Sequence, residues 1–349
     1  MEQKIIRVLV VDDSAYVRKV ISQMLIRSPF IEVVGAARDG EEALELVDRL
    51  KPDVITLDLN MPRLDGVGFL KAQMARRPVP VVICSIAGES GENALAAFDA
   101  GAVDFVQKPT ALATDKVFEI AADLVEKVKA AAAVPLARIG TAPPALEPIV
   151  SMPALVSAAA KFDMLVIGVS TGGPQALKWL VPRLPKEFPI PVAMVLHMPV
   201  GYTEMYAKSL NDLSQLEVRE AVEGDEVKRG LALLAPAGRH LSFVRQSDGK
   251  VLAHLDARPF DTPHRPAVDV LFRSAAEVFG PRVLGVVMTG MGSDGRAGSE
   301  CIKAQGGQIF TEAESSCVVY GMPRSVVEAG WSDRVVPLDQ LAKTIMEAA

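Results

Sequence analysis

Short apolar runs alternate with helical patterns along most of this 349-residue chain. In the first part, residues 14–28 and 40–50 have helical periodicity, and the strand-like runs are IIRVLVV, IEVVGAA, DVITLDL, PVVICS and DFVQ. Five such alternations predict a doubly wound parallel sheet. The alternation resumes near Lys161, with the strand-like runs MLVIGVS, PVAMVLH, LALLAPA, VLGVVMT and QIFT. The length suits two ordinary domains, so we expect two α/β domains, each built on a doubly wound parallel sheet.

A segment rich in alanine and proline separates the two alternating regions. Residues 129–160 carry little charge and show no clear periodicity. This composition is typical of a linker that is extended where the prolines fall. We therefore expect a first domain over residues 1–128, a linker over 129–160 and a second domain over 161–349.

The charge and the apolar pattern argue against several classes of protein. A net charge of −6 and a pI near 5.4 disfavour a nucleic-acid partner, which normally meets a basic patch. No apolar run approaches the ~20 residues that cross a bilayer, and Asp12 and Asp13 interrupt the N-terminal run VLVV. The three cysteines are scattered and lack metal-ligand spacing, as expected of free thiols in a reducing cytosol: Cys84, Cys301 and Cys317. We expect a cytoplasmic protein without direct membrane insertion.

Three aspartates follow predicted strands of the first domain. Asp12 and Asp13 end the first strand, and Asp58 ends the third. Because sites of such sheets form at the carboxyl ends of the strands, these carboxylates should converge. Each one alone could simply cap a helix, but three converging carboxylates repel one another unless a cation is present, and such oxygen ligands suit Mg²⁺. Ser85 and Lys108, at the ends of the fourth and fifth strands, could contact phosphoryl oxygens.

The motifs VDDS, LDLNMPRLDG and DFVQKP, with the serine after VVIC, resemble the receiver domain of two-component response regulators. The resemblance covers the whole first domain. It implies a flavodoxin-like fold in which Asp58 accepts a phosphoryl group from a histidine kinase. It also implies two groups of supporting residues: the Mg²⁺ ligands Asp12, Asp13, Asp58 and the backbone of Asn60, and the residues that report phosphorylation, Ser85, Phe105 and Lys108. Phe105 has no hydroxyl, so the hydrogen bond that a tyrosine makes in other receivers is absent here.

The second domain opens with a serine in a glycine-rich turn, GVSTGGP, directly after a predicted strand. The turn fits the G-x-S-x-G pattern of serine hydrolases. Ser170, His197 and Asp294 each follow a separate predicted strand, so parallel strands would bring a nucleophile, a base and an orienting carboxylate to one sheet edge. Pro174 suits a helix start, whose N–H groups would point toward a developing oxyanion. The order of the three residues differs from that in α/β-hydrolases.

Each of these residues also has a plainer interpretation. Ser170 could cap a helix, His197 could be a surface or hydrogen-bonded histidine, and Asp294 could stabilise its own loop. The other histidines are weaker candidates for the base, the first two in predicted loops and the third in a predicted strand: His240, His264 and His254.

A nucleotide-binding alternative rests on residues 290–295, GMGSDG, which match G-x-G-x-x-G after the run VLGVVMT. Glu312 and Glu314 lie near the position of the acidic residue that binds the ribose in dinucleotide-binding folds. Asp294 argues against this alternative because its carboxylate would stand inside the turn that the pyrophosphate approaches.

Several motifs resemble the catalytic domain of the chemotaxis protein-glutamate methylesterases: GVSTGGP, LHMP, APAGRHL, HRPAVDVLFRSAA, MTGMGSDG and SSCVVYGMPRSVVEAG. That family joins an N-terminal receiver to a catalytic domain, so the resemblance covers nearly the whole chain. It implies a Rossmann-like three-layer αβα hydrolase domain in which Ser170 is the nucleophile, His197 the general base and Asp294 the orienting carboxylate. Thr171 and the N–H of Met291 would assist at the oxyanion.

The resemblance also implies a reaction and its partners. The expected activity is phosphorylation-activated hydrolysis of glutamate methyl esters, with deamidation of glutamines, on the cytoplasmic helices of chemoreceptors, which sets adaptation. A histidine kinase would be the phosphodonor. Mg²⁺ would serve the receiver, and ester hydrolysis would need no cofactor. The alternative is a response regulator whose second domain binds a nucleotide or a protein partner without catalysis.

Overall fold

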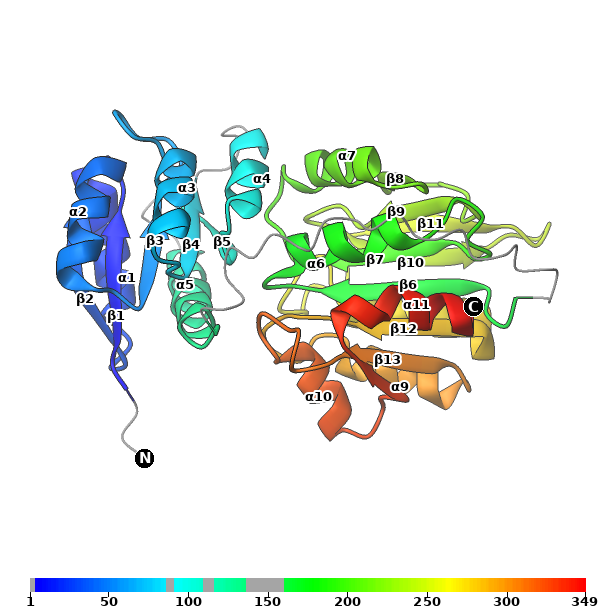
Figure 1. The fold of residues 1–349 in the computed structure, drawn as a ribbon. Helices are drawn as coiled ribbons and strands as arrows, with labels where there is room; N and C mark the ends of the chain where they lie inside the picture. The colour runs from blue at the N-terminus through cyan, green and yellow to red at the C-terminus, as the bar shows by residue number, and fades with distance from the viewer. Residues whose placement is uncertain (1–3, 86–90, 109–115, 136–159) are drawn as a thin grey trace. The chain divides into compact units, whose positions relative to one another are not determined.

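Two parallel β-sheets, one in each of two units, organise the chain in the computed structural model (Figure 1). The units comprise residues 1–142 and 143–349. The structure describes residues 4–85, 91–108, 116–135 and 160–349. The predicted pair of α/β units with parallel sheets is confirmed.

The first unit has a five-stranded sheet with the order β2-β1-β3-β4-β5. All neighbouring strands are parallel: β1 (Ile6–Val11), β2 (Ile31–Ala37), β3 (Val54–Leu57), β4 (Val81–Ser85) and β5 (Asp104–Gln107). The helices are α1 (Ala15–Leu25), α2 (Gly40–Leu50), α3 (Gly66–Arg76), α4 (Gly91–Asp99) and α5 (Lys116–Ala132). This strand order is flavodoxin-like, and it places a ligand site where β1 and β3 meet.

Polar residues cap the first three helices of this unit. Ser14, Asp39 and Asp65 precede α1, α2 and α3, and each side chain accepts a hydrogen bond from the N–H three residues later. Such caps satisfy amides that the helix leaves unpaired. A Cβ on Gly66 would lie 2.4 Å from the carbonyl oxygen of Asp58, so only glycine lets α3 begin against the end of β3.

The helix α5 continues to Ala132, beyond the residue at which we expected the first domain to end. The run of alanines explains this difference, since alanine is the strongest helix former. Most of the expected linker, residues 136–159, lies outside the described residues. The domain boundaries therefore stay a prediction.

The second unit has a seven-stranded sheet with the order β14-β13-β12-β6-β7-β9-β8. The strands, all parallel, are β6 (Met164–Val169), β7 (Val192–Leu196), β8 (Glu217–Glu220), β9 (Leu231–Leu234), β12 (Val283–Val287), β13 (Gln308–Glu312) and β14 (Arg334–Val336). The α-helices are α6 (Gly173–Leu180), α7 (Thr203–Leu213), α8 (Val268–Phe279), α9 (Arg296–Ala304), α10 (Met322–Glu328) and α11 (Leu338–Ala348), with short 3₁₀ turns η2 (Val181–Arg183) and η3 (Gly280–Arg282).

Two groups of helices enclose this sheet. Helices α6, α7 and α11 pack together, as do α8, α9 and α10. After β6 the chain adds β7 and the strands beyond it toward one edge of the sheet, and after β12 it adds β13 and β14 toward the other edge. Because crossovers between parallel strands are right-handed, the two groups of helices lie on opposite faces of the sheet. The result is the predicted three-layer αβα arrangement.

Some strands were not predicted from the sequence. The edge strands β8, with the sequence EVRE, and β14, with three residues, have no apolar run to mark them. An antiparallel hairpin of β10 (His240–Arg245) and β11 (Val251–Asp256) packs against α8. The prediction that His240 lies in a loop is wrong, because this residue begins β10 and is only 1% exposed. The start of this strand could not be predicted because Gly238, two positions earlier, is typical of a loop.

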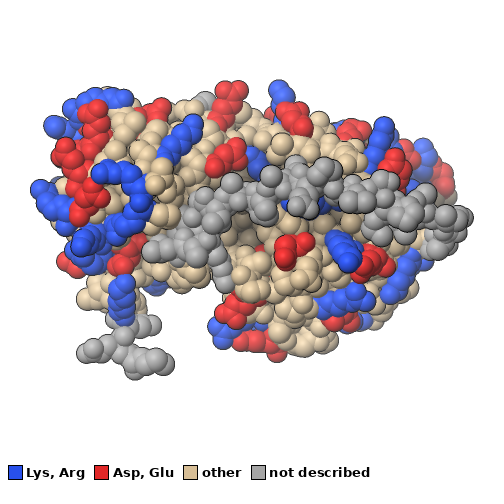
Figure 2. Space-filling view, viewed as in Figure 1, with Lys and Arg blue, Asp and Glu red and all other residues tan. Residues whose placement is uncertain are grey.

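Basic and acidic side chains are intermixed over the face of the molecule shown in Figure 2. Across the described ranges, no helix is both long and apolar enough to cross a membrane. Cys84 and Cys317 are buried and Cys301 is half-buried, and none of the three forms a disulfide, as predicted.

Candidate catalytic and phosphoryl-acceptor sites

A tight turn places Ser170 directly after β6. Gly172 has a φ of +77°, and a Cβ there would lie 2.5 Å from the Cβ of Val318, so both conformation and space require glycine. The N–H of Ser170 donates to the carbonyl of Thr289 at 3.0 Å, and its carbonyl accepts from the N–H of Gly173 at 2.7 Å. The backbone of the turn is therefore held without use of the serine hydroxyl.

Three neighbouring strands carry the predicted triad to one edge of the sheet. Strands β12, β6 and β7 lie side by side, and Asp294, Ser170 and His197 follow their carboxyl ends. The N–H of His197 donates to the carbonyl of Val169 at 3.2 Å. His197 Nε2 lies 2.8 Å from Asp294 Oδ2, and these side chains are 8% and 5% exposed. The structure thus brings the candidate base and carboxylate into direct contact.

Two backbone amides also hold the Asp294 carboxylate. Its Oδ2 accepts from the N–H of Val268 and its Oδ1 from the N–H of Asp269, each at 2.8 Å, in the first turn of α8. In return, Asp269 Oδ1 accepts two N–H groups at the start of α9. Burial by itself would raise the pKa of Asp294, but the hydrogen bond and charge of His197, together with the amides, outweigh it and lower the pKa. The carboxylate is therefore ionised and fixed in orientation.

Hydrogen bonding decides which nitrogen of His197 can act as a base. Asp294 accepts the proton on Nε2, and Nδ1 is buried with no hydrogen-bond partner among the described residues. A neutral imidazole bonded in this way has its lone pair on Nδ1. Serine proteases use the reverse arrangement, in which the carboxylate binds Nδ1 and Nε2 faces the serine. No hydrogen bond joins Ser170 Oγ to His197 within the described residues; such bonds are often long without substrate.

A second histidine stacks on the candidate base. The ring centroids of His197 and His264 are 4.0 Å apart, with 26° between the planes. The other two histidines have different roles: His240 Nδ1 accepts a backbone N–H at 3.1 Å, and His254 Nδ1 lies 3.0 Å from Glu223 Oε1. Burial lowers the pKa of His240. Of the histidines judged weaker candidates for the base, His264 is the one whose ring stacks on His197.

The glycine-rich residues 290–295 form the loop between β12 and α9. The N-terminus of α9, where a dinucleotide pyrophosphate would bind, is already capped by the carboxylate of Asp269. Asp294 in the same loop contacts the candidate base. Glu312, the candidate ribose ligand, is fully buried and accepts the N–H of Thr289 at 2.8 Å. This geometry disfavours the nucleotide-binding alternative.

The candidate oxyanion groups lie in segments that contact each other. Thr171 is 2% exposed, and its carbonyl accepts the Thr289 hydroxyl at 2.9 Å. Gly290 packs so closely on the candidate nucleophile that a Cβ on it would lie 2.8 Å from the Cβ of Ser170. The chain therefore passes Ser170 immediately before Met291, the predicted backbone donor.

Three carboxylates converge in the first unit. One oxygen from each of Asp12, Asp13 and Asp58 lies within 4.8 Å of the others; Asp12 and Asp58 are buried and Asp13 is exposed. Lys108 Nζ lies 2.7 Å from Asp12 Oδ2 and 2.8 Å from Asp58 Oδ2. Hard oxygen ligands at this spacing, open to solvent on the side of Asp13, fit Mg²⁺.

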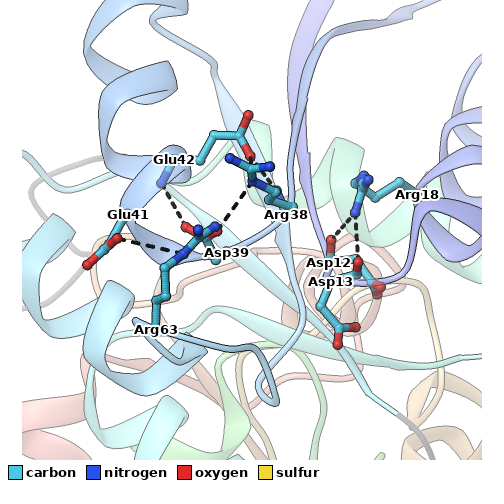
Figure 3. A network of polar contacts seen from close by, with 8 residues as sticks. All are labelled: Asp12, Asp13, Arg18, Arg38, Asp39, Glu41, Glu42 and Arg63. Carbon is cyan, nitrogen blue, oxygen red and sulfur yellow. Dashed lines mark hydrogen bonds and ion pairs between the residues drawn. The ribbon is translucent and has the colours of Figure 1, made fainter.

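Backbone contacts hold the acidic residues in place. Arg18 Nη1 donates to the carbonyls of Asp12 and Asp13 at 2.7 and 3.0 Å, which fixes the end of β1 (Figure 3). The backbone nitrogen of Asn60 lies 3.5 Å from Asp58 Oδ1. The Asn60 backbone is thus beside the candidate phosphoryl acceptor.

The candidate switch residues lie on β4, which neighbours β3, and on β5, which neighbours β4. Ser85 ends β4 and Phe105 lies in β5, and both are buried. The carbonyl of Ser85 accepts the N–H of Lys108 at 2.8 Å. The carbonyl of Phe105 accepts Lys127 Nζ at 2.7 Å, which ties α5 to this position.

Asp58 should make the stability of the first unit depend on pH. Burial raises the pKa of Asp58 from 3.8 to about 6, although the ammonium of Lys108 opposes the shift. A carboxyl group with a raised pKa stabilises the folded state fully below about pH 4, and that contribution is lost as the pH rises through about 6. Asp58→Asn removes the ionisable group, so we expect a gain in stability at pH 7.5 of at most about 3 kcal/mol that disappears near pH 4.

Amide hydrogen exchange of β1 and β3, measured across this pH range without divalent cations, checks this expectation. Asp48→Asn is the matched control, since Asp48 is exposed and pairs with Arg76 far from the cluster. The raised pKa of Asp58 would be contradicted if amide protection in Asp58→Asn differed from that in wild type by the same amount at every pH.

Comparison with known proteins gives matches over both units. The model of the CheB methylesterase family matches residues 165–345, and that of the response regulator receiver domain matches residues 8–117. A protein-glutamate methylesterase/protein-glutamine glutaminase 5 of Myxococcus xanthus is 52% identical, covering 96% of this chain and 95% of its own. A protein-glutamate methylesterase/protein-glutamine glutaminase of Symbiobacterium thermophilum is 45% identical, and the match covers 99% of this chain and 98% of that protein. Among solved structures, the chain is similar to the crystal structure of the Thermotoga maritima CheB methylesterase catalytic domain, with 41% sequence identity and a TM-score of 0.53. That match covers 54% of this chain and 99% of the solved chain.

Fold and site together define a response-regulator receiver followed by a three-layer α/β unit, in which a serine turn and a histidine–carboxylate pair share one sheet edge. The chain belongs to the CheB methylesterase family, whose matching relatives are named protein-glutamate methylesterase/protein-glutamine glutaminase. The resemblance drawn from the sequence motifs is confirmed.

Proposed function

We propose that this chain hydrolyses glutamate methyl esters, and deamidates glutamines, on the cytoplasmic helices of chemoreceptors, and that phosphorylation of its receiver activates it. The observation that carries the proposal is the 2.8 Å contact between His197 Nε2 and Asp294 Oδ2, at the sheet edge where Ser170 lies. The names of the relatives supply the substrate chemistry.

In the proposed mechanism, Ser170 Oγ attacks the ester carbonyl while His197 Nδ1 takes its proton. The carboxylate of Asp294, bonded to Nε2, stabilises the imidazolium that forms. Thr171 and the backbone N–H of Met291 donate hydrogen bonds to the developing oxyanion. The imidazolium then returns its proton to the departing methoxide, so that methanol leaves and an acyl-enzyme remains.

Water completes the cycle by the reverse sequence. His197 Nδ1 takes a proton from water as it attacks the acyl carbonyl, and the proton returns to Ser170 Oγ as the glutamate is released. With a glutamine substrate, ammonia leaves in place of methanol. These side chains supply the nucleophile, the base and the charge stabilisation, so we assign no cofactor to ester hydrolysis.

In the receiver, we propose that Asp58 accepts a phosphoryl group from a histidine kinase. Bound Mg²⁺ would offset negative charge between the carboxylates and the incoming phosphoryl group. Asp12, Asp13, Asp58 and the backbone of Asn60 would hold the ion. The remaining assignments are the residues that would respond to the phosphoryl group: Ser85 by its hydroxyl, Lys108 by its ammonium and Phe105 by its packing.

Asp58→Asn should abolish stimulation of the esterase by a small phosphodonor with Mg²⁺ while leaving basal activity, because an amide cannot form the acyl phosphate. Methanol release with and without phosphodonor is the measurement. Asp48→Asn, an exposed aspartate of the same unit, should be stimulated like wild type. Stimulation that persists in Asp58→Asn would place the phosphoryl acceptor elsewhere.

We propose a receiver domain over residues 1–128, with its last helix reaching Ala132, a linker up to residue 160 and a catalytic domain from residue 161. A substrate on cytoplasmic receptor helices makes the cytoplasm the proposed location.

The test of the whole proposal is methanol release from isolated methylated chemoreceptors, combined with covalent labelling of Ser170 by a serine-directed inhibitor. Tight NAD binding that is lost when Gly290 or Gly292 is replaced, with no methanol release, would instead support the non-catalytic alternative.

A further inference from the structure

Thr289 joins the segments that surround the candidate nucleophile. It follows β12 and is 1% exposed. Its carbonyl accepts the N–H of Ser170 at 3.0 Å, and its hydroxyl donates to the carbonyl of Thr171 at 2.9 Å. The same hydroxyl accepts the N–H of Val319 at 3.0 Å. One buried side chain thus links the nucleophile turn to the loop before α10.

Glu312 fixes Thr289 from the neighbouring strand. It ends β13, is fully buried, and its Oε2 accepts the N–H of Thr289 at 2.8 Å. Its Oε1 accepts the hydroxyl of Ser316 at 2.9 Å, and that hydroxyl in turn accepts the N–H of Leu338. The two oxygens of Glu312 therefore contact different segments, and the side chain links Thr289 to the loop after β13.

The loop that carries the candidate oxyanion donor depends on the same contacts. Gly290 follows Thr289, its N–H donates to the carbonyl of Val319 at 3.0 Å, and its carbonyl accepts two N–H groups, from Gly321 and Met322. A Cβ on Gly321 would lie 2.7 Å from the carbonyl oxygen of Gly290, so the two segments touch along their backbones. A displacement of Thr289 would therefore move this loop relative to Ser170.

We propose that Thr289, anchored by Glu312, is a positioning residue that sets the distance between the nucleophile turn and the loop carrying the N–H of Met291. This proposal rests on the esterase function proposed above. Hydrogen-bond donors stabilise the transition state only when they lie about 2.7–3.1 Å from the oxyanion, and a misplacement of about 1 Å costs roughly 10²-fold in rate. Loss of the Thr289 hydroxyl should therefore slow the chemical step more than it weakens substrate binding.

The matched variants are Thr289→Val, which keeps the shape but removes the hydroxyl, and Thr289→Ser, which keeps the hydroxyl. We expect Thr289→Val to lower kcat for methanol release by roughly 10²-fold with KM changed less than about threefold. Thr289→Ser should recover most of the lost kcat. Glu312→Gln, whose amide oxygen can still accept the N–H of Thr289, should likewise stay far closer to wild type than Glu312→Leu.

A general loss of packing is controlled by Thr311→Val. Thr311 is fully buried in β13, and its hydroxyl bonds that of Ser332 away from the site. This variant should be destabilised in thermal unfolding but keep the wild-type kcat. A boronic acid that forms a tetrahedral adduct on Ser170 gives a second measurement: Thr289→Val should weaken its binding by about the same factor as kcat/KM falls.

The outcomes separate this inference from the proposed function. Equal kcat values in Thr289→Val and Thr289→Ser would overturn the positioning role of Thr289. A fall in kcat in Thr311→Val as large as that in Thr289→Val would overturn it too. If the wild-type protein released no methanol, the esterase assignment itself would fail.

Discussion

Ser170→Ala is expected to slow methanol release from methylated receptors by a factor on the order of 10⁶, the loss seen when the nucleophile of a serine protease is removed. The hydroxyl forms the bond to the acyl group, and no neighbouring group replaces it. The turn should keep its conformation, because its hydrogen bonds to Thr289 and Gly173 use only the backbone of residue 170. The variant should therefore unfold at the wild-type temperature.

Ser293→Ala is the matched control, since Ser293 is an exposed serine in the loop before Asp294 and makes no step of the proposed reaction. It should retain activity and inhibitor labelling, whereas Ser170→Ala should lose both. His197→Ala should be similarly damaged, and the double variant should lose little more, because the residues act as a unit. Activity within tenfold of wild type in Ser170→Ala would exclude Ser170 as nucleophile.

The order of strands and helices could be predicted from the sequence because buried parallel strands are continuous apolar runs. Strands β6, β7 and β12 were all found in this way, and their carboxyl ends located the site residues. The edge strands β8 and β14 were missed because they are short or polar, and their pairing comes from neighbours distant in the sequence. The end of α5 was missed because alanine-rich helix and alanine-rich linker have the same composition.

The chemistry of the site was less accessible from the sequence. Which nitrogen of His197 faces the carboxylate depends on how β7 and the loop after β12 approach each other, and no spacing encodes that. The stacking of His264 and the contacts of Thr289 are equally long-range. Glu312 was a candidate ribose ligand from its position in the chain, but its burial directs it to a backbone amide instead.

Asp294→Asn should lower kcat by about 10⁴, as the same change does in a serine protease. The geometry leaves the asparagine no harmless orientation. If its oxygen faces His197 and its NH₂ takes the place of Oδ1, that NH₂ meets the N–H of Asp269, donor against donor. If it turns over, the NH₂ faces Nε2, which must then hold the lone pair, so the proton moves to Nδ1 and the base is lost. Either way, the charge that stabilises the imidazolium disappears.

Asp269→Asn tests whether this loss belongs to the contact with His197 or merely to a missing charge at a helix start. Asp269 caps α9 with a single oxygen, Oδ1, and an asparagine oxygen can accept the same two N–H groups. Burial raises the pKa of Asp269, so its ionised form is already disfavoured and its neutral replacement should cost little. We expect Asp269→Asn to keep kcat within tenfold of wild type, while kcat in Asp294→Asn falls by about 10⁴. The two variants should unfold at similar temperatures. Equal losses in the two variants would show that the pair acts only by holding α8 and α9 together, and His197 would then need no carboxylate to act as the base.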